Sequence, residues 1–315
     1  MTKHSERACP AFKTSVGGQA LMEGVMMRGP EKIACAVRKP DGTIYTEARG
    51  LAKHAWQKIP VVRGVGSFVD SLVTGYRYLM KSAEVSMTES QREEEQSAFD
   101  RWVDAHLGEK GANAVMALAA VLGGALAVAL FVVLPTFLVG LLDKAVALGG
   151  FKTLLEGVLK IALLVAYMAA VSTMPDIARM FRYHGAEHKT IACYEAGLPL
   201  TVENVRGCSR FHPRCGTSFI LIILIVSVLV FSVLPWSSTG LRVLLKLLLL
   251  PLVMGVSYEI LKLCGRYDNF VTRIVSAPGL WLQRITTKEP DDSMIECAIA
   301  AVTPVLPENR EDGRW

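Results

Sequence analysis

Several common sequence signatures are missing from this chain, and each absence removes a class of protein. Although the net charge is +5, no basic stripe is interleaved with aromatic residues, so we expect no nucleic-acid partner. The first residues are polar, and residues 17–30 are too short and too charged for the apolar part of a cleavable signal peptide. That glycine-rich segment also lacks the lysine-and-hydroxyl ending of a phosphate-binding loop. We find no internal repeat and no low-complexity tract.

Charge is also absent over long distances. Residues 113–142 are thirty successive residues without a charged side chain. A helix of that length reaches about 45 Å, more than the ~30 Å hydrocarbon core of a bilayer, so we expect it to tilt, or to kink or end at Pro135. Three further apolar runs cover residues 151–174, 218–236 and 241–265. The sequence therefore predicts a mainly α-helical, polytopic membrane protein with about four transmembrane helices.

Lysine and arginine residues predict the orientation of these helices. The connection between the second and third runs, residues 175–217, carries six of them, whereas the connections after the first and third runs carry one and none. Basic flanks stay on the cytoplasmic side, so both termini and residues 175–217 are predicted to be cytoplasmic. The expected location is the bacterial cytoplasmic (inner) membrane, where basic residues contact lipid headgroups.

The N-terminal polar region is predicted to be a small cytoplasmic α+β region at residues 15–112, after a flexible segment at residues 1–14. Two alternating segments flank a Pro-Asp-Gly turn, which predicts a β-hairpin at residues 32–49. Residues 59–85 have apolar side chains at helical spacing and are predicted to form an amphipathic interfacial helix. Residues 88–104 form an acidic linker to which we assign no function.

The C-terminal polar region, residues 266–305, is also predicted to be cytoplasmic or interfacial. Residues 270–285 are amphipathic with a proline in the middle, which suggests an interfacial helix pair broken at Pro278. A further helix is expected after Asp291 or Asp292, either of which can cap it. The polar tail, residues 306–315, is expected to be frayed.

Residue types that bind metals are concentrated in residues 175–217, which hold three of the six histidines and three of the seven cysteines. His184, Glu187 and His188 form an H-x-x-E-H pattern. Two histidines four residues apart lie on one face of a helix, so their imidazoles can converge on one cation. This order is that of the inverted zinc-protease motif, in which the glutamate is the base. The pattern predicts a site for zinc or another divalent transition metal, with Glu187 as the catalytic base.

Other side chains nearby can complete such a site. Glu195 follows seven residues after His188 on about the same helical face. Cys208, His212 and Cys215 lie in a predicted turn, and turn-borne Cys/His pairs are common zinc ligands. We expect His212, Cys215 or Glu195 to complete the set of metal ligands. Metal-assisted hydrolysis of an unidentified substrate is then the favoured function.

The same residues also permit other interpretations. Histidines near a membrane surface can bond to carbonyls or headgroups, and cysteines are often inert small hydrophobes. Cys215 next to His212 can instead form a thiolate–imidazole nucleophile, although the sequence identifies no third group to orient it. The alternative function is a non-catalytic scaffold that recruits a protein partner or forms a homo-oligomer, with a structural metal or none.

Three charged residues outside that connection are further candidates. Glu259 lies inside the fourth apolar run, where an ionisable side chain is costly. It is a candidate ligand, a partner of a ligand, or the proton carrier of a small transporter; otherwise it reaches the interface or pairs with Arg266. Glu23 and Arg28 are the only charges in residues 17–30, and no role follows for them from the sequence. The same holds for residues 286–290, Thr-Thr-Lys-Glu-Pro.

Five motifs in order carry a resemblance to a known family: GGQALMEGVMMRGP, YHGAEHKTIACYE, HPRCGTSF, SYEILKLCGR and PGLWLQRITTKEP. Together they resemble the YqhQ-like bacterial membrane proteins, which have been labelled predicted metal-dependent enzymes. The resemblance covers about residues 15–302 and implies a multi-pass inner-membrane protein. It implies no substrate.

Overall fold

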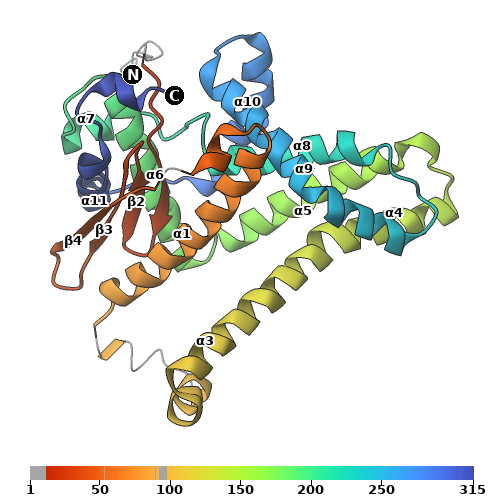
Figure 1. The fold of residues 1–315 in the computed structure, drawn as a ribbon, viewed down its shortest axis with the longest axis horizontal. Helices are drawn as coiled ribbons and strands as arrows, with labels where there is room; N and C mark the ends of the chain where they lie inside the picture. Colours follow the sequence, from red (N-terminus) through yellow and green to blue (C-terminus); the bar gives the residue numbers. More distant parts are fainter. Residues whose placement is uncertain (1–11, 53, 89, 92–97) are drawn as a thin grey trace. The chain divides into compact units, whose positions relative to one another are not determined.

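A computed structural model describes residues 12–52, 54–88, 90–91 and 98–315 (Figure 1). Most of the predicted flexible segment 1–14 and part of the predicted acidic linker 88–104 lie outside these residues. The chain divides into two compact units, which are described separately. The first consists of the described part of Met1–Ser86 with Met168–Ile222 and Met254–Trp315, and the second of the described part of Met87–Tyr167 with Ile223–Val253.

The first unit contains a four-stranded antiparallel sheet in the order β1-β2-β3-β4. Its strands are β1 (Gly17–Leu21), β2 (Gly24–Arg28), β3 (Lys32–Arg38) and β4 (Ile44–Gly50). The predicted hairpin at residues 32–49 is confirmed as β3 and β4. Residues 17–30, for which the sequence predicted no structure, form the other hairpin, and Glu23 has a left-handed backbone (φ 52°) in its turn.

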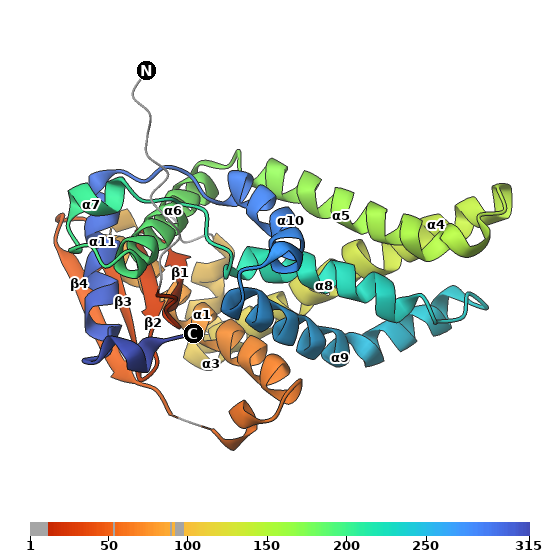
Figure 2. The same ribbon diagram turned by 90° about the horizontal axis from the view of Figure 1, so that it is seen from above.

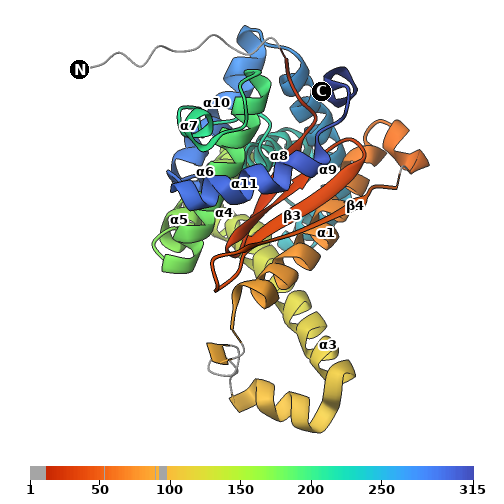
Figure 3. The same cartoon turned by 90° about the vertical axis from the view of Figure 1, so that its left-hand side faces the viewer.

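Helices cover both faces of the sheet because its apolar residues alternate (Figure 3). Val25, Met27 and Ala34 pack on the side of α6 (Pro175–Glu195) and α11 (Asp292–Val302). Met26 and Cys35 pack with Tyr78 of α1 (Val62–Ser86) on the other side. The predicted amphipathic helix is thus α1, with one side on the sheet. The predicted connection 175–217 is largely helical, since it contains α6 and α7 (Val202–Arg206).

The C-terminal region departs from two expectations. Residues 270–286 form one continuous helix, α10 (Phe270–Thr286), with Pro278 inside it, so the expected break into a helix pair is wrong. The tail is not frayed: Arg310 donates to the carbonyl oxygens of Tyr194 and Glu195, and Arg314 pairs with Thr14 as an isolated β-bridge. The predicted cap of α11 is confirmed as Asp291, which accepts a hydrogen bond from the amide of Met294.

The second unit is helical (Figure 2). It contains α3 (Ala98–Val128), α4 (Leu134–Ala145) and most of α5 (Lys152–Val171), with parts of α8 (Gly216–Phe231) and α9 (Thr239–Arg266). A π-helical turn, Ala129–Val133, joins α3 to α4 next to Pro135, where the sequence predicted a kink. Figure 2 shows α4, α5, α8 and α9 running side by side.

Three helices among the described residues are long and apolar enough to cross a membrane: Ala117–Ala145, Gly149–Val171 and Thr239–Arg266. They correspond to the first, second and fourth predicted runs. The third run, residues 218–236, differs because its helix ends at Phe231, four residues before Pro235. At 16 residues, α8 is about 24 Å long, shorter than the hydrocarbon core. A fourth span is therefore not established.

Charged side chains are buried in the second unit. The carboxylate of Glu156 on α5 contacts the ammonium groups of Lys160 at 2.7 Å and Lys246, and lies 3.5 Å from the Arg242 guanidinium. All four side chains are at most 6% exposed. The guanidinium of Arg242 also lies 3.7 Å from the centre of the Trp236 ring, which offsets part of the cost of its burial.

Candidate metal centre

Helix α6 carries the H-x-x-E-H pattern. Pro175 occupies its first turn together with Asp176, a favourable start, and Gly197 adopts a left-handed conformation (φ 69°) just after its end. His184 and His188 are four residues apart, so their rings lie one turn apart, with centroids separated by 4.4 Å. The helical spacing predicted from the sequence is confirmed.

Cys215 completes a cluster with the two histidines, which we call the His–His–Cys cluster. Nε2 of His184 lies 3.2 Å from Sγ of Cys215. One ligand atom from each of His184, His188 and Cys215 can be chosen so that all lie within 4.8 Å of one another. Of the side chains proposed to complete the set of ligands, the structure thus brings Cys215 to the two histidines.

Backbone carbonyl groups fix both histidine rings. Nδ1 of His184 donates to the carbonyl oxygen of Thr286 at 2.8 Å, and Nδ1 of His188 donates to that of Arg210 at 2.6 Å. A carbonyl oxygen only accepts, so Nδ1 carries a proton in each ring and Nε2 is left for the cluster. Metal-binding histidines are usually held in this way.

This geometry explains the segment Thr286–Pro290. Thr286 orients His184, and the next carbonyl, of Thr287, accepts a hydrogen bond from Arg210. Gly185 lets this segment approach α6, since a Cβ atom there would lie 2.0 Å from the carbonyl oxygen of Lys288. A glycine at position 185 is therefore a packing requirement.

Glu187 lies beside the cluster, with Oε2 4.0 Å from Nε2 of His184. Gly18 of β1 donates its backbone N–H to this carboxylate, and a Cβ atom on Gly18 would lie 3.1 Å from Cδ of Glu187. Within the described part of the chain, the buried Oε2 atom has no hydrogen-bond partner. Burial raises the pKa of Glu187, although His184 and His188 oppose this. A raised pKa suits a group that exchanges protons near neutral pH.

His184 and Cys215 form a polarised pair. Burial alone would lower the pKa of His184, but the neighbouring Cys215 outweighs it and raises that pKa to about 9. Burial alone would raise the pKa of Cys215, but His184 and His188 lower it well below its usual value. The site therefore favours the thiolate, which is the form that binds metals and attacks electrophiles.

His212 and Glu195 lie next to the cluster but interact mainly with Arg214. The Glu195 carboxylate pairs with Arg214 and accepts the backbone N–H of Thr14 at 2.6 Å. Nε2 of His212 lies 3.1 Å from Nη2 of Arg214 and 3.5 Å from Oε2 of Glu195. Burial lowers the pKa of His212. The His212 ring centroid is 5.7 Å from that of His188, so His212 can support the cluster from one side.

The remaining sequence candidates lie elsewhere. Glu259 pairs with Arg63, and not with Arg266 as one alternative proposed. Cys208 lies 3.3 Å from the carbonyl oxygen of Asn204.

Glu23 and Arg28 acquire roles in packing. Glu23 accepts hydrogen bonds from Arg179 and Tyr183 of α6, which tie the turn between β1 and β2 to that helix. Arg28 pairs with Asp70 of α1 at 2.5 Å.

Several residues of the site were not identified from the sequence. Thr217 lies 3.2 Å from Sγ of Cys215 through its hydroxyl group. Gln283 is fully buried and bonds to both the amide and the carbonyl of His212. The sequence carried no clear signal for either residue, since Gln283 shares its buried helical face with Ser276, Gly279 and Thr286.

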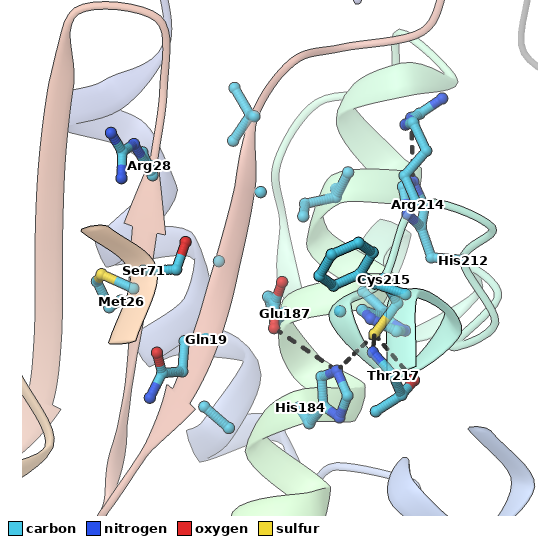
Figure 4. A pocket seen from close by; sticks show the side chains of 18 of the residues that line it. Gln19, Met26, Arg28, Ser71, His184, Glu187, His212, Arg214, Cys215 and Thr217 are labelled. Carbon is cyan, nitrogen blue, oxygen red and sulfur yellow. Dashed lines mark hydrogen bonds and ion pairs between the residues drawn. The ribbon is translucent and has the colours of Figure 1, made fainter. Parts of the chain in front are cut away.

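The cluster opens into a cavity of about 820 Å³. Figure 4 shows His184, Glu187 and Cys215 gathered on one side of it, and Gln19, Met26, Arg28 and Ser71 on the other. The lining comes from β1, β2, α1 and α6 and from the ends of α8 and α9. A volume of this size is typical of a site for a small organic ligand.

A family profile and a similar protein each match most of this chain. The profile of a family described as "Protein of unknown function (DUF1385)" matches residues 59–308, which include the whole cluster. The chain is also similar to "Uncharacterized protein YqhQ" of Bacillus subtilis (strain 168), with 35% identity over 314 residues, covering 97% of this chain and 95% of the relative. No solved structure matches.

Proposed function

This chain belongs to the DUF1385 family. We propose that it is a membrane-embedded hydrolase whose His–His–Cys cluster binds a divalent transition metal. The observation that carries this proposal is the convergence of three donor atoms, from His184, His188 and Cys215, beside a cavity. Zinc is the best match, because it takes nitrogen and sulfur ligands together.

The donor set fits such an ion. Two nitrogen or sulfur ligands at normal zinc distances are about 3.3–3.6 Å apart in a tetrahedral site. The pair His184–Cys215, at 3.2 Å, is close to that separation, and the wider separations in the group, which extend up to 4.8 Å, must shorten for all three atoms to bind one ion. Three protein ligands leave one position open, the arrangement found in catalytic rather than structural zinc sites.

The residues of the chain then have defined tasks. A bound ion of this class supplies a Lewis acid and lowers the pKa of water. Glu187 accepts the proton of the attacking water and passes it to the leaving group, and its unpartnered Oε2 atom is available for this. Thr286 and Arg210 hold the two imidazoles by their carbonyl groups. The cavity binds the rest of the substrate.

The expected setting is the bacterial cytoplasmic membrane, with both termini and the cluster on the cytoplasmic side. The three long apolar helices support membrane insertion, and the six basic residues of the connection 175–217 support the orientation. Membrane lipids are the expected partners of the apolar surface. The proposal also includes binding of a protein partner or of a second copy of the chain.

Metal content tests the proposal directly. Protein purified in detergent should contain about one ion per chain by elemental analysis. His184→Ala, His188→Ala and Cys215→Ser should each lose most of it, whereas His54→Ala, which changes an exposed histidine, should keep it. Equal and substoichiometric metal in all five proteins would remove the metal site.

A second variant separates catalysis from structure. Glu187→Gln should retain the metal but lose roughly 10²–10⁴ in the rate of p-nitrophenyl ester hydrolysis, the usual contribution of a general base. Full activity with a full metal site would instead indicate a structural metal in a non-catalytic scaffold.

The contact between His184 and Cys215 also favours a second candidate, a cysteine-dependent hydrolase without a metal. Here Cys215 would be the nucleophile and His184 its base, with Thr286 as the orienting group that the sequence did not reveal. The two candidates differ in their need for a metal. A cysteine enzyme should keep its activity in the presence of a chelator, whereas a metalloenzyme should lose it and regain it when zinc is added back.

A further inference from the structure

Away from the His–His–Cys cluster, the lining of the cavity carries little free charge for a polar ligand. Among the described residues that line it outside the cluster, Arg28, Glu187 and Arg214 are charged. Arg28 is paired with Asp70, and Arg214 with Glu195. Glu187 is the base of the proposed reaction. A substrate with a strongly charged headgroup would therefore meet no free countercharge from these arginines in the cavity.

Apolar side chains line much of the remaining wall. They come from four helices and are Phe68, Ile177, Met180, Phe219, Ile220 and Leu261. Burying a hydrocarbon chain against such a surface is favourable by about 0.8 kcal/mol for each methylene, which corresponds to about fourfold in affinity. The apolar wall thus matches a hydrocarbon chain, and an ester carbonyl group at its end would lie near the cluster.

One wall of the cavity is also an apolar outer surface. On α1, Leu72 lines the cavity and is 57% exposed, while its neighbours Val69 and Val73 are 51% and 65% exposed. Helices that combine a polar face with exposed apolar residues are typical of the membrane interface. Leu72 therefore joins the cavity to this apolar surface, along which a hydrocarbon chain can enter.

We propose that the cavity takes a single hydrocarbon chain from the membrane, presented as a carboxylic ester with its carbonyl carbon at the cluster. This inference rests on the proposed hydrolase function and names its substrate class. The oxygen of water bonds to the carbonyl carbon, and the carbon–oxygen bond to the alcohol breaks. The water proton passes through Glu187 to the departing oxygen. The products are a long-chain carboxylic acid and an alcohol.

A rate experiment tests the substrate class. Full-length protein in lipid nanodiscs is given p-nitrophenyl esters of acetate, butyrate, octanoate and dodecanoate, with the double variant His184→Ala/His188→Ala as the background. kcat/KM should rise with chain length, by up to about fourfold for each methylene. A rate that is highest for acetate, or independent of chain length, would overturn the inference while leaving the hydrolase in place.

A binding experiment is independent of activity. Hexadecanol with a mid-chain diazirine is cross-linked to the protein in nanodiscs, and labelled residues are mapped by mass spectrometry. Because this probe is uncharged, a substituted charge does not attract or repel its headgroup. Labels that unlabelled hexadecanol competes away should map to α1 and α6 around Phe68 and Met180. Labelling confined to those parts of the predicted membrane spans that do not line the cavity would overturn the inference.

Two adjacent substitutions on α1 provide a matched pair. Leu72→Asp places a charge at the cavity, whereas Val73→Asp places one on a similarly exposed position outside it. Leu72→Asp should reduce competed labelling about tenfold or more, and Val73→Asp should change it less than about twofold. Equal effects would contradict a cavity-bound chain. Normal labelling with no hydrolysis of any ester would instead remove the hydrolase and retain the cavity as a binding site for the chain.

Discussion

In the helical unit, the carboxylate of Glu156 is surrounded by three cations, whereas in the sheet-containing unit the carboxylate of Glu187 keeps one oxygen without a partner among the described residues. Both side chains are almost fully buried, at 2% and 4% exposure. Burial of a carboxylate therefore does not distinguish the two regions. They differ in how many partners the buried carboxylate has.

Most polar groups around Glu156 form hydrogen bonds or ion pairs with one another. Lys246 bonds to both Glu156 and the hydroxyl of Thr136, and Arg242 donates to the carbonyl oxygen of Leu234 at 2.7 Å. The Nε atom of Arg242 has no hydrogen-bond partner in the described structure, but its guanidinium lies against the Trp236 ring. Removing one partner from such a buried group leaves an uncompensated charge, so the pairing must stay complete for these helices to remain packed.

The His–His–Cys cluster is built in the opposite way. Its backbone contacts occupy the outer nitrogen of each histidine and leave the inner donor atoms facing one another and a cavity. Such donor atoms repel each other or share protons unless a cation lies between them. The comparison indicates that incomplete pairing beside a cavity, rather than burial, marks the functional region.

The largest effect should follow from breaking the fully paired region. Glu156→Gln leaves three buried cations without their anion, which should cost about 3–5 kcal/mol in the free energy of unfolding. Thermal unfolding of the purified protein measures it. Asp143→Asn is the control, because it breaks a partly exposed pair with Lys152 and should cost about 1 kcal/mol or less. Equal stability of the two variants would show that the Glu156 region does not hold the helices together.

A smaller effect is expected where the cluster meets the segment Thr286–Pro290. In Gly185→Ala, the new methyl group would collide with the carbonyl of Lys288, which should cost about 1–3 kcal/mol. Because the shift moves Thr286 away from His184, metal affinity should also fall, by roughly 10–100-fold. Competition with a chromophoric chelator measures that affinity.

The control for this change is another glycine inside a helix. Gly124 of α3 has no atom within 4 Å of an added Cβ atom. Gly124→Ala should therefore be neutral or stabilising, by up to about 1 kcal/mol, with unchanged metal affinity. A Gly185→Ala protein that binds metal like the wild type would show that the contact with Thr286 does not position His184.

The parts of this structure that the sequence predicted depend on periodicity. Apolar runs identified the three long helices, alternation around Pro40–Gly42 identified the hairpin of β3 and β4, and the four-residue spacing placed His184 and His188 on one helical face. These patterns reflect contacts between residues close in sequence. Pro278 misled the prediction because packing of the buried Leu282 and Gln283 outweighs the loss of one helical hydrogen bond.

The parts that the sequence could not predict depend on contacts between distant segments. The ring of His184 is oriented by a carbonyl 102 residues away, and a backbone carbonyl has no signature in a sequence. Glu195 had the correct spacing for a ligand, but Arg214 and Thr14 compete for its carboxylate. The choice of Cys215 over Glu195 as the third member of the cluster therefore required the fold.

The smallest effect should come from an ordinary polar contact in the unit that carries the cluster, and it gives a baseline for the two larger changes. Asp291 caps α11, where its carboxylate accepts from the amide of Met294 and the hydroxyl of Ser293. Asp291→Ala should cost about 1 kcal/mol at neutral pH. Asp292→Ala, which breaks an exposed pair with Arg206, should cost a few tenths and is the neighbouring control.

The cost of Asp291→Ala should also depend on pH. Burial opposes the shift, but the hydrogen bonds from Ser293 and Met294 hold the pKa of Asp291 below its usual value. A group with a lowered folded pKa stabilises in full above its unfolded pKa, near 3.9, and loses this contribution as the pH falls through the folded value. Wild type and variant should therefore converge in stability below about pH 4. A constant difference down to pH 2 would mean that the charge of the Asp291 carboxylate does not cause the stability difference. The substitution would then report only the lost packing of the side chain.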